Sequence, residues 1–288
     1  MKAEGLIDVF LEKFNNGACG KNFADSSAFI SIKHMYDVQE DEKYLKVISD
    51  YMEKYVADDG SMANVVGDKF NAADVNCAKL LFFMYDKTGD EKYKKAIENV
   101  MQGLRDYLDK NAGECMSMEE LYMVQPFYAE YETKYDKKAK YGDIIKLFEQ
   151  AESRLETAGN PVDQFSLYMA ALIDSLSVMS FEIYEKYRQI QDMFKSALKK
   201  LADRRDTDKE AFAIKGADNA VNAMAAYAII KACRLGIVLK EKYAPLGMEI
   251  VESLNNNTEE IFKDTRAAGA FISAYGQYLQ FKKESEED

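Results

Sequence analysis

The amino-acid sequence predicts an all-α protein folded as a single (α/α)6 barrel, and three observations lead to this prediction. The chain of 288 residues is 48% hydrophobic and has only three prolines, a composition that favours helices over strands. Apolar residues recur at three- and four-residue spacing along nearly the whole chain, and strand-like alternation is scarce. A helical motif with a tyrosine near its start also repeats roughly every 50 residues, which indicates a series of helix pairs.

The periodicity predicts twelve helices of two kinds. One kind is amphipathic and rich in Lys and Glu, as expected for outer helices, and contains the repeated tyrosines Tyr44, Tyr93, Tyr141, Tyr187 and Tyr243. These outer helices are expected at 41–57, 90–109, 138–157, 182–203 and 239–256. The other kind is apolar on nearly all sides, which favours an inner position, at 26–37, 72–87, 118–134, 163–179, 217–236 and 267–283. The N-terminal helix, 5–16, is expected to be the sixth outer helix and to pack beside 267–283.

Loop lengths predict where a pocket lies. No linker divides the chain, so residues 1–288 are expected to form one domain, with 283–288 as a disordered acidic tail. Most connections from an outer helix to the next inner helix are long, at 58–71, 110–117, 204–216 and 257–266. They lie at the N-terminal ends of the inner helices, toward which the positive ends of the helix dipoles also point. We therefore expect a pocket at this end of the barrel, called the mouth below.

Composition excludes several classes of function. The net charge is −12 with basic residues scattered among acidic ones, so no nucleic-acid partner is expected. No apolar run is long enough for a signal peptide or a membrane span, and we expect a cytoplasmic protein without a membrane partner. The four cysteines form no C-x-x-C pair and are expected to be reduced and mostly buried. With His34 as the single histidine, neither a His/Cys metal site nor a His-dependent triad is expected, and no cofactor is predicted.

Acidic residues stand at the starts of successive inner helices. Capping and helix-dipole stabilisation account for any single one of them, but together they would ring the mouth: Asp25, Asp74, Glu119, Glu120, Asp163 and Asp218. Sugar-cleaving sites need two carboxylates, one acting as acid. Asp74 and Glu119 lie on neighbouring inner helices at matching depth, and we predict that they form the catalytic pair.

The same part of the chain supplies candidate substrate-binding residues for an oligosaccharide or another small polar ligand. These are Glu120, Tyr122, Asp163, Tyr168 and Asp218. Tyr122, Phe127, Tyr168 and Tyr227 could each provide stacking surface for a sugar, although core packing is the simpler interpretation for every one.

Two motifs resemble those of a known enzyme family. Residues 70–74 read FNAAD and are followed by LLFFMYDKTGDEKY, and residues 117–127 read SMEELYMVQPF. Residues 218–232 and the sequence GAFISA at 269–274 add weaker matches. The chain thereby resembles the unsaturated glucuronyl and unsaturated rhamnogalacturonyl hydrolases, which are (α/α)6-barrel glycoside hydrolases, over roughly residues 25 to 275.

The resemblance implies a reaction and roles for two residues. These enzymes hydrate the double bond of an unsaturated uronic acid left by a polysaccharide lyase, and the unstable product opens and releases its neighbour. Glu119 would be the general acid/base and Asp74 its partner. The family has aspartate where this chain has Glu119, an arginine for the uronate carboxylate where it has Asp163, and a tryptophan where it has Leu167.

Two alternatives remain open at the level of sequence. These replacements, and the absence of tryptophan from the chain, are also what a catalytically inactive barrel, used for binding or as a scaffold, would show. The ring of acids could instead bind a divalent cation or a cationic ligand, although no EF-hand-like spacing is present. The sequence predicts no oligomeric state.

Overall fold

Six helices form a closed inner ring in the part of the chain that the computed structural model describes, which is residues 3–16, 20–62 and 70–287. Each inner helix packs against the next one in the ring, and the last packs against the first, which closes the barrel. The inner helices are α2 (Phe23–Gln39), α4 (Ala72–Thr88), α6 (Met118–Lys134), α8 (Val162–Val178), α10 (Asn219–Arg234) and α13 (Thr265–Glu287).

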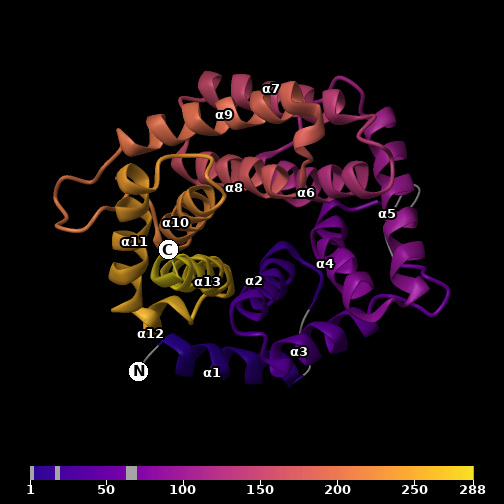
Figure 1. Ribbon diagram of the computed structural model, residues 1–288, viewed down its shortest axis with the longest axis horizontal. Coiled ribbons are helices and arrows are strands. Elements are labelled where there is room, and N and C mark those ends of the chain that lie inside the picture. The colour runs from indigo at the N-terminus through magenta and orange to yellow at the C-terminus, as the bar shows by residue number, and fades with distance from the viewer. Residues whose placement is uncertain (1–2, 17–19, 63–69, 288) are drawn as a thin grey trace.

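An outer layer of six helices surrounds this ring (Figure 1). Its members are α1 (Ala3–Asn15), α3 (Glu42–Glu53), α5 (Glu91–Lys110), α7 (Tyr141–Thr157), α9 (Tyr184–Ala202) and α11 (Lys240–Asn255). All but α1 pack on the inner helix that precedes them, and α1 reaches α13 through Tyr275, whose hydroxyl donates to Glu4 at 2.7 Å. The predicted all-α (α/α)6 barrel is confirmed, with one isolated β-bridge, Arg205–Ile214, among the described residues.

Capping residues explain where inner helices begin. Asn71, Ser117 and Asp218 each accept a backbone N–H from the first turn of α4, α6 and α10, which satisfies donors that a helix start otherwise leaves unpaired. Because Asn71 and Ser117 cap α4 and α6, the nearby acids Asp74 and Glu119 are not needed for this purpose. Asp218, in contrast, is itself a cap.

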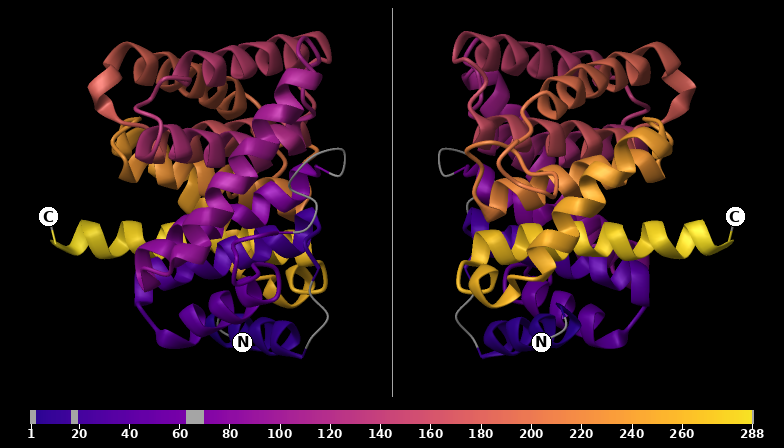
Figure 2. Two further views of the ribbon diagram at one scale, coloured as in Figure 1. Left: turned by 90° about the vertical axis from the view of Figure 1, so that its right-hand side faces the viewer. Right: turned by 90° about the vertical axis from the view of Figure 1, so that its left-hand side faces the viewer.

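The structure differs from the sequence-based expectation at two connections and at the end of the last helix. A 3-10 turn, η2 (Phe181–Ile183), precedes α9, and the short helix α12 (Thr258–Ile261) lies within the predicted loop 257–266. Instead of ending at 283 in a disordered tail, α13 continues to Glu287 and its C-terminal part projects from the barrel (Figure 2). Arg234 explains the extension, because its Nε and Nη2 donate to Glu284 at 3.1 and 2.6 Å.

Three of the four cysteines lie in the described part of the chain. Cys77 and Cys233 are buried and Cys115 is exposed, all three as free thiols, while Cys19 and residues 63–69 of the loop 58–71 lie outside the described residues. No single described helix is long and apolar enough to cross a membrane. Helix α8 and the segment Phe181–Ala202 are together long and apolar enough, but the chain bends by 108° between them.

Two glycines allow α13 to approach α2 closely where the ring closes. A Cβ atom at Gly269 would lie 3.2 Å from Cα of Ala28, and one at Gly276 would lie 3.3 Å from the carbonyl oxygen of His34. We therefore expect Gly269→Leu to force the two helices apart and to lower the free energy of unfolding by about 1–3 kcal/mol, measured by urea unfolding.

A glycine without neighbours provides the control for this prediction. Among the described residues outside its own helical turns, no atom lies within 4 Å of the ideal Cβ position of Gly142 on α7. Gly142→Leu should therefore be neutral or stabilising by up to about 1 kcal/mol, because glycine is a poor helix former. Equal effects of the two substitutions would contradict the close approach at Gly269.

Candidate active site at the barrel mouth

A cavity of about 50 Å³ lies at the mouth, where the first turns of five inner helices converge. Helices α2, α6, α8, α10 and α13 contribute, and α4 does not appear in the lining. The cavity is lined by Phe23, Glu119, Asp163, Ser166, Leu167, Ala220, Val221, Met224, Arg266 and Ala270.

The charged groups at this cavity are two carboxylates and a guanidinium. Glu119 and Asp163 are both exposed, one at the start of α6 and the other at the start of α8. Arg266, from the first turn of α13, is the cation among the described lining residues. Its Nη2 donates to Oδ2 of Asp218 at 2.6 Å, which brings Asp218 to the rim. The structure thus gathers Glu119, Asp163 and Asp218 at one place.

Asp74, in the first turn of α4, lies outside this cavity. Its side chain is buried, and one carboxylate oxygen, Oδ1, is 3.0 Å from Nζ of Lys21. The ammonium of Lys21 also lies 5.5 Å from the centre of the Tyr55 ring. Asp74 is absent from the lining of the mouth cavity, so the structure does not bring Asp74 and Glu119 to one cavity. Lys21 offsets the charge of Asp74.

Glu120 faces the outside of the ring. Its Oε2 accepts the backbone N–H of Ser117 at 2.8 Å to complete a capping box, and its Oε1 accepts from the hydroxyl of Tyr107 at 3.3 Å. It also lines a cavity of about 740 Å³ between α5, the loop after α5, and α7. The side chain of Glu120 therefore has a structural role as a helix cap.

Tyr122 lies one turn beneath Glu119, under the mouth. The edge of its ring meets Phe23 with the ring centres 5.9 Å apart, and Nζ of Lys79 lies 4.2 Å from its ring centre. The backbone carbonyl of Tyr122 lacks its usual helical donor, because the residue four positions later is Pro126, which has no N–H. Lys79 Nζ donates to this carbonyl at 2.6 Å and so satisfies the group that the proline leaves unpaired.

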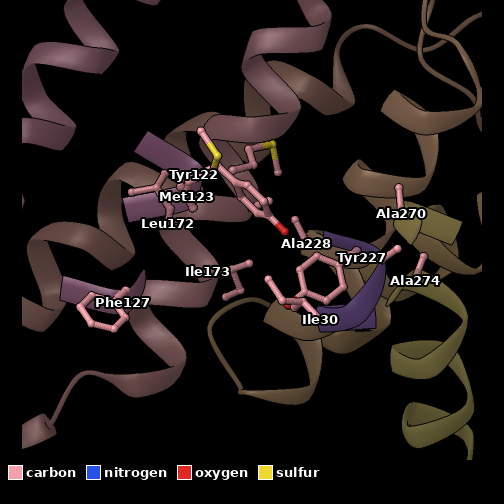
Figure 3. Packing of buried hydrophobic residues seen from close by; sticks show 14 of the residues in the cluster. Ile30, Tyr122, Met123, Phe127, Leu172, Ile173, Tyr227, Ala228, Ala270 and Ala274 are labelled. Atoms are coloured by element: carbon pink, nitrogen blue, oxygen red, sulfur yellow. The ribbon is translucent and has the colours of Figure 1, made fainter. Parts of the chain in front are cut away.

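Three other predicted stacking residues belong to the core. Tyr168 packs on Phe148 of the outer helix α7, with ring centres 6.1 Å apart, and Phe127 packs on Phe82 of α4 at 5.1 Å. Tyr227 is buried in the barrel interior, where Tyr122 reaches toward it from the other side (Figure 3). Phe127, Tyr168 and Tyr227 therefore pack in the core, as the simpler interpretation of the sequence held.

The barrel interior contains a polar cluster, defined here as His34, Asp174, Tyr227, Lys231 and Ser273. The hydroxyl of Tyr227 donates to Asp174 at 2.5 Å, and Lys231 Nζ donates to Asp174 at 2.7 Å and to the Tyr227 oxygen at 3.1 Å. His34 Nε2 is 3.4 Å from the Tyr227 oxygen and its Nδ1 is 3.1 Å from Ser273 Oγ. Because the single proton of Tyr227 goes to Asp174, His34 must donate through Nε2 and accept through Nδ1.

Burial and charge set the protonation states in this cluster. Burial lowers the pKa of His34 well below its usual value, and Lys231 and Lys33 lower it further. Burial alone would raise the pKa of Asp174, but attraction by Lys231 and Lys79 outweighs it and the pKa is lowered. The cluster therefore holds a neutral imidazole and an ionised carboxylate. Lys79 lies beside it on α4, where burial lowers its pKa to about 7, opposed by Asp174 and reinforced by Lys231.

Replacing Lys79 by methionine should change how stability depends on pH. The pKa of this lysine falls from 10.5 to about 7 on folding, so between these values the unfolded chain binds more protons and the wild type gains stability as the pH rises. We expect the free energy of unfolding of Lys79→Met, relative to the wild type, to fall between about pH 7 and about pH 10 in urea titrations. Lys46→Met, on the exposed face of α3, is the control, and a difference that stays constant with pH would contradict the prediction.

Metal binding finds no support in the described residues. Within residues 3–16, 20–62 and 70–287, no group of three or more His, Cys, Asp or Glu side chains is arranged to hold a metal ion. Among the acids at the mouth, Asp218 is paired with Arg266.

Comparison with known proteins assigns the family. A sequence profile described as Glycosyl Hydrolase Family 88 matches residues 13–160, slightly more than half of the 288 residues. The chain belongs to glycosyl hydrolase family 88. A search of curated proteins finds no sequence match.

Solved structures similar to this family 88 chain have the same fold at low sequence identity. A family 105 glycoside hydrolase from C. acetobutylicum has a TM-score of 0.77 at 16% identity, covering 96% of this chain and 99% of its own. A protein described as a polysaccharide lyase has a TM-score of 0.75 at 14% identity, covering 98% of both chains. A family 88 glycosyl hydrolase from Bacteroides vulgatus has a TM-score of 0.67 at 12% identity, covering 98% of this chain and 100% of its own.

Sequence reasoning missed two basic residues at the inner-helix starts of this family 88 chain. Lys21 lies two residues before α2 and Arg266 in the first turn of α13, so both stand at starts of inner helices. Cations are unfavourable at helix N-termini. A lysine and an arginine at these positions were therefore unusual, and they could have indicated paired charges at the mouth. Nothing in the sequence pattern pointed to the contact between Lys79 and the Tyr122 carbonyl beyond the presence of Pro126.

Proposed function

We propose that this family 88 protein hydrolyses oligosaccharides that end in an unsaturated uronic acid, with Glu119 as the general acid/base. The observation that carries the proposal is the position of Glu119. It is exposed on the mouth cavity, shares that cavity with Asp163 and Arg266, and is not used as a helix cap. A carboxyl group that is open to the mouth and not consumed by a structural role is available to transfer a proton.

The chemistry follows from the electronic structure of the substrate. An unsaturated uronic acid contains an enol ether, so protonation at C4 leaves a positive charge at C5 that the ring oxygen stabilises. Glu119 would donate this proton, and its carboxylate would then take a proton from the water that adds to C5. The resulting hemiketal opens and releases the neighbouring sugar. Asp163 is the second carboxylate that lines the cavity, whereas Asp74 pairs with Lys21 and is not part of the lining.

Lyase digests of pectin and of glycosaminoglycans test the proposal. The double bond that a lyase creates absorbs ultraviolet light, and hydration removes the absorbance while a shorter saccharide is released. We expect the wild type to remove the absorbance of at least one digest and to release a shorter product from it. If no digest loses absorbance at high enzyme concentration, the hydrolase proposal is wrong.

A second candidate function is binding without turnover. The ion pair between Asp74 and Lys21 and the small volume of the mouth cavity favour it, because a cavity of about 50 Å³ admits one polar group of a ligand and not a whole sugar ring. Calorimetric binding of the same oligosaccharides without loss of absorbance would support this candidate, and release of product would exclude it.

A further inference from the structure

Arg266 offsets part of the negative charge at the mouth cavity. Glu119 and Asp163 contribute two carboxylates to the lining, and Arg266 is the cationic side chain among the described lining residues. Without Arg266 this cavity would repel any anionic group of a ligand. The guanidinium is therefore the group in this lining that would attract an acidic sugar.

The guanidinium is held at one corner. Its Nη2 donates to Oδ2 of Asp218 at 2.6 Å, and the other oxygen of Asp218 accepts the backbone N–H of Val221 at 2.8 Å as the cap of α10. The backbone of Arg266 is fixed as well, because its N–H donates to Asp264 at 2.9 Å. Two helix starts thus determine the position of the side chain, which reduces the entropy lost when it binds a ligand.

The rest of the guanidinium remains available. The Arg266 side chain is 42% exposed and lines the cavity while it holds Asp218. An arginine fork matches the two oxygens of a carboxylate. The walls around it are largely apolar, with Phe23, Leu167 and Met224 among them, and such walls strengthen an ion pair by excluding water. The volume of about 50 Å³ suits a carboxylate group, which is close in size to one or two water molecules.

We infer that Arg266 is the specificity-determining residue that binds the carboxylate of the terminal uronic acid, and that Asp218 is the residue that positions it. The inference rests on the proposed function, because the acid is that of the same substrate. The sugar ring then sits above the cavity with its charged group directed inward, between the starts of α10 and α13.

The test compares an acidic substrate with its neutral methyl ester. The wild type should have a higher kcat/KM for the free acid, and Arg266→Gln should lower kcat/KM for the acid roughly 10- to 100-fold, mainly through KM, while leaving the ester nearly unchanged. Arg266→Lys should restore part of the preference because it keeps the charge. Asp218→Asn keeps a good helix cap and should raise KM for the acid by a smaller factor. Arg188→Gln, on an exposed arginine of α9 paired with Asp192, is the matched control and should change nothing.

Two results would overturn the inference. One is an equal fall of kcat/KM for the acid and for the ester in Arg266→Gln. The other is an equal kcat/KM for the two substrates in the wild type. If the wild type shows no turnover, calorimetry with the same acid and ester separates the two proposals. Tighter binding of the acid that disappears in Arg266→Gln would keep the role of Arg266 while the hydrolase proposal fails. Absence of that preference would overturn the role of Arg266 as well.

Discussion

Glu119→Gln is expected to lower the rate of double-bond hydration roughly 100- to 10,000-fold, the usual contribution of a general acid/base. Glutamine keeps the size and the hydrogen-bonding capacity of glutamate but cannot transfer a proton. Because Glu119 is exposed on the mouth cavity, the substitution should leave the free energy of unfolding nearly unchanged. The measurement is the initial rate of absorbance loss on the substrate that the wild type hydrolyses best.

The neighbouring residue supplies the control. Glu120→Gln changes the same functional group one position along α6, but Glu120 faces the outside of the ring and completes the capping box with Ser117. Glutamine serves in that box as well as glutamate, so both stability and activity should be retained. If Glu119→Gln and Glu120→Gln are equally active, Glu119 does not carry the chemistry.

Asp174→Ala is expected to destabilise the fold by about 3–5 kcal/mol, because removing one partner of a buried ion pair leaves the other without compensation. Asp174 accepts hydrogen bonds from both Lys231 and Tyr227, and it also attracts the ammonium of Lys79. Its loss would leave the Lys231 ammonium in the barrel interior without its carboxylate partner. Urea unfolding at neutral pH measures the change.

An exposed ion pair gives the comparison. Asp192 pairs with Arg188 on the surface of α9, with both side chains more than half exposed, and Asp192→Ala should cost no more than about 1 kcal/mol. The contribution of Asp174 to the free energy of unfolding should also depend on pH. Its pKa is lowered in the folded state, so its contribution is present above the usual value of 3.8 and is lost as the pH falls through the lower folded value. A cost of Asp174→Ala similar to that of Asp192→Ala would contradict the role given to the cluster.

The sequence alone predicted the twelve main helices and their inner or outer positions, and both are confirmed. Their boundaries differ by a few residues, with α2 starting at Phe23 instead of 26 and α13 extending to Glu287. This success has a local cause. The spacing of apolar residues and the distribution of charge around each helix depend only on neighbours along the chain, and an inner helix must be apolar on nearly all sides.

The sequence also led to the mouth and to part of its lining. Glu119 and Asp163 were expected there because they begin inner helices, and both line the cavity. Starts of parallel inner helices necessarily meet at one end of a closed ring, so position along the chain was enough to place them.

Only the tertiary structure decided which side chains meet. Asp74 and Glu119 both lie in the first turns of neighbouring inner helices, yet Asp74 pairs with Lys21 and Glu119 faces the cavity. Lys79 reaches the carbonyl that Pro126 leaves unpaired, and Arg266 reaches Asp218 across 48 positions of sequence. Helical periodicity determines which face of a helix is buried, but pairing across helices depends on rotation, depth and rotamer, which no local pattern encodes. The sequence by itself therefore determined the barrel and the end that carries the site, and the packing of its helices determined the charges that surround Glu119.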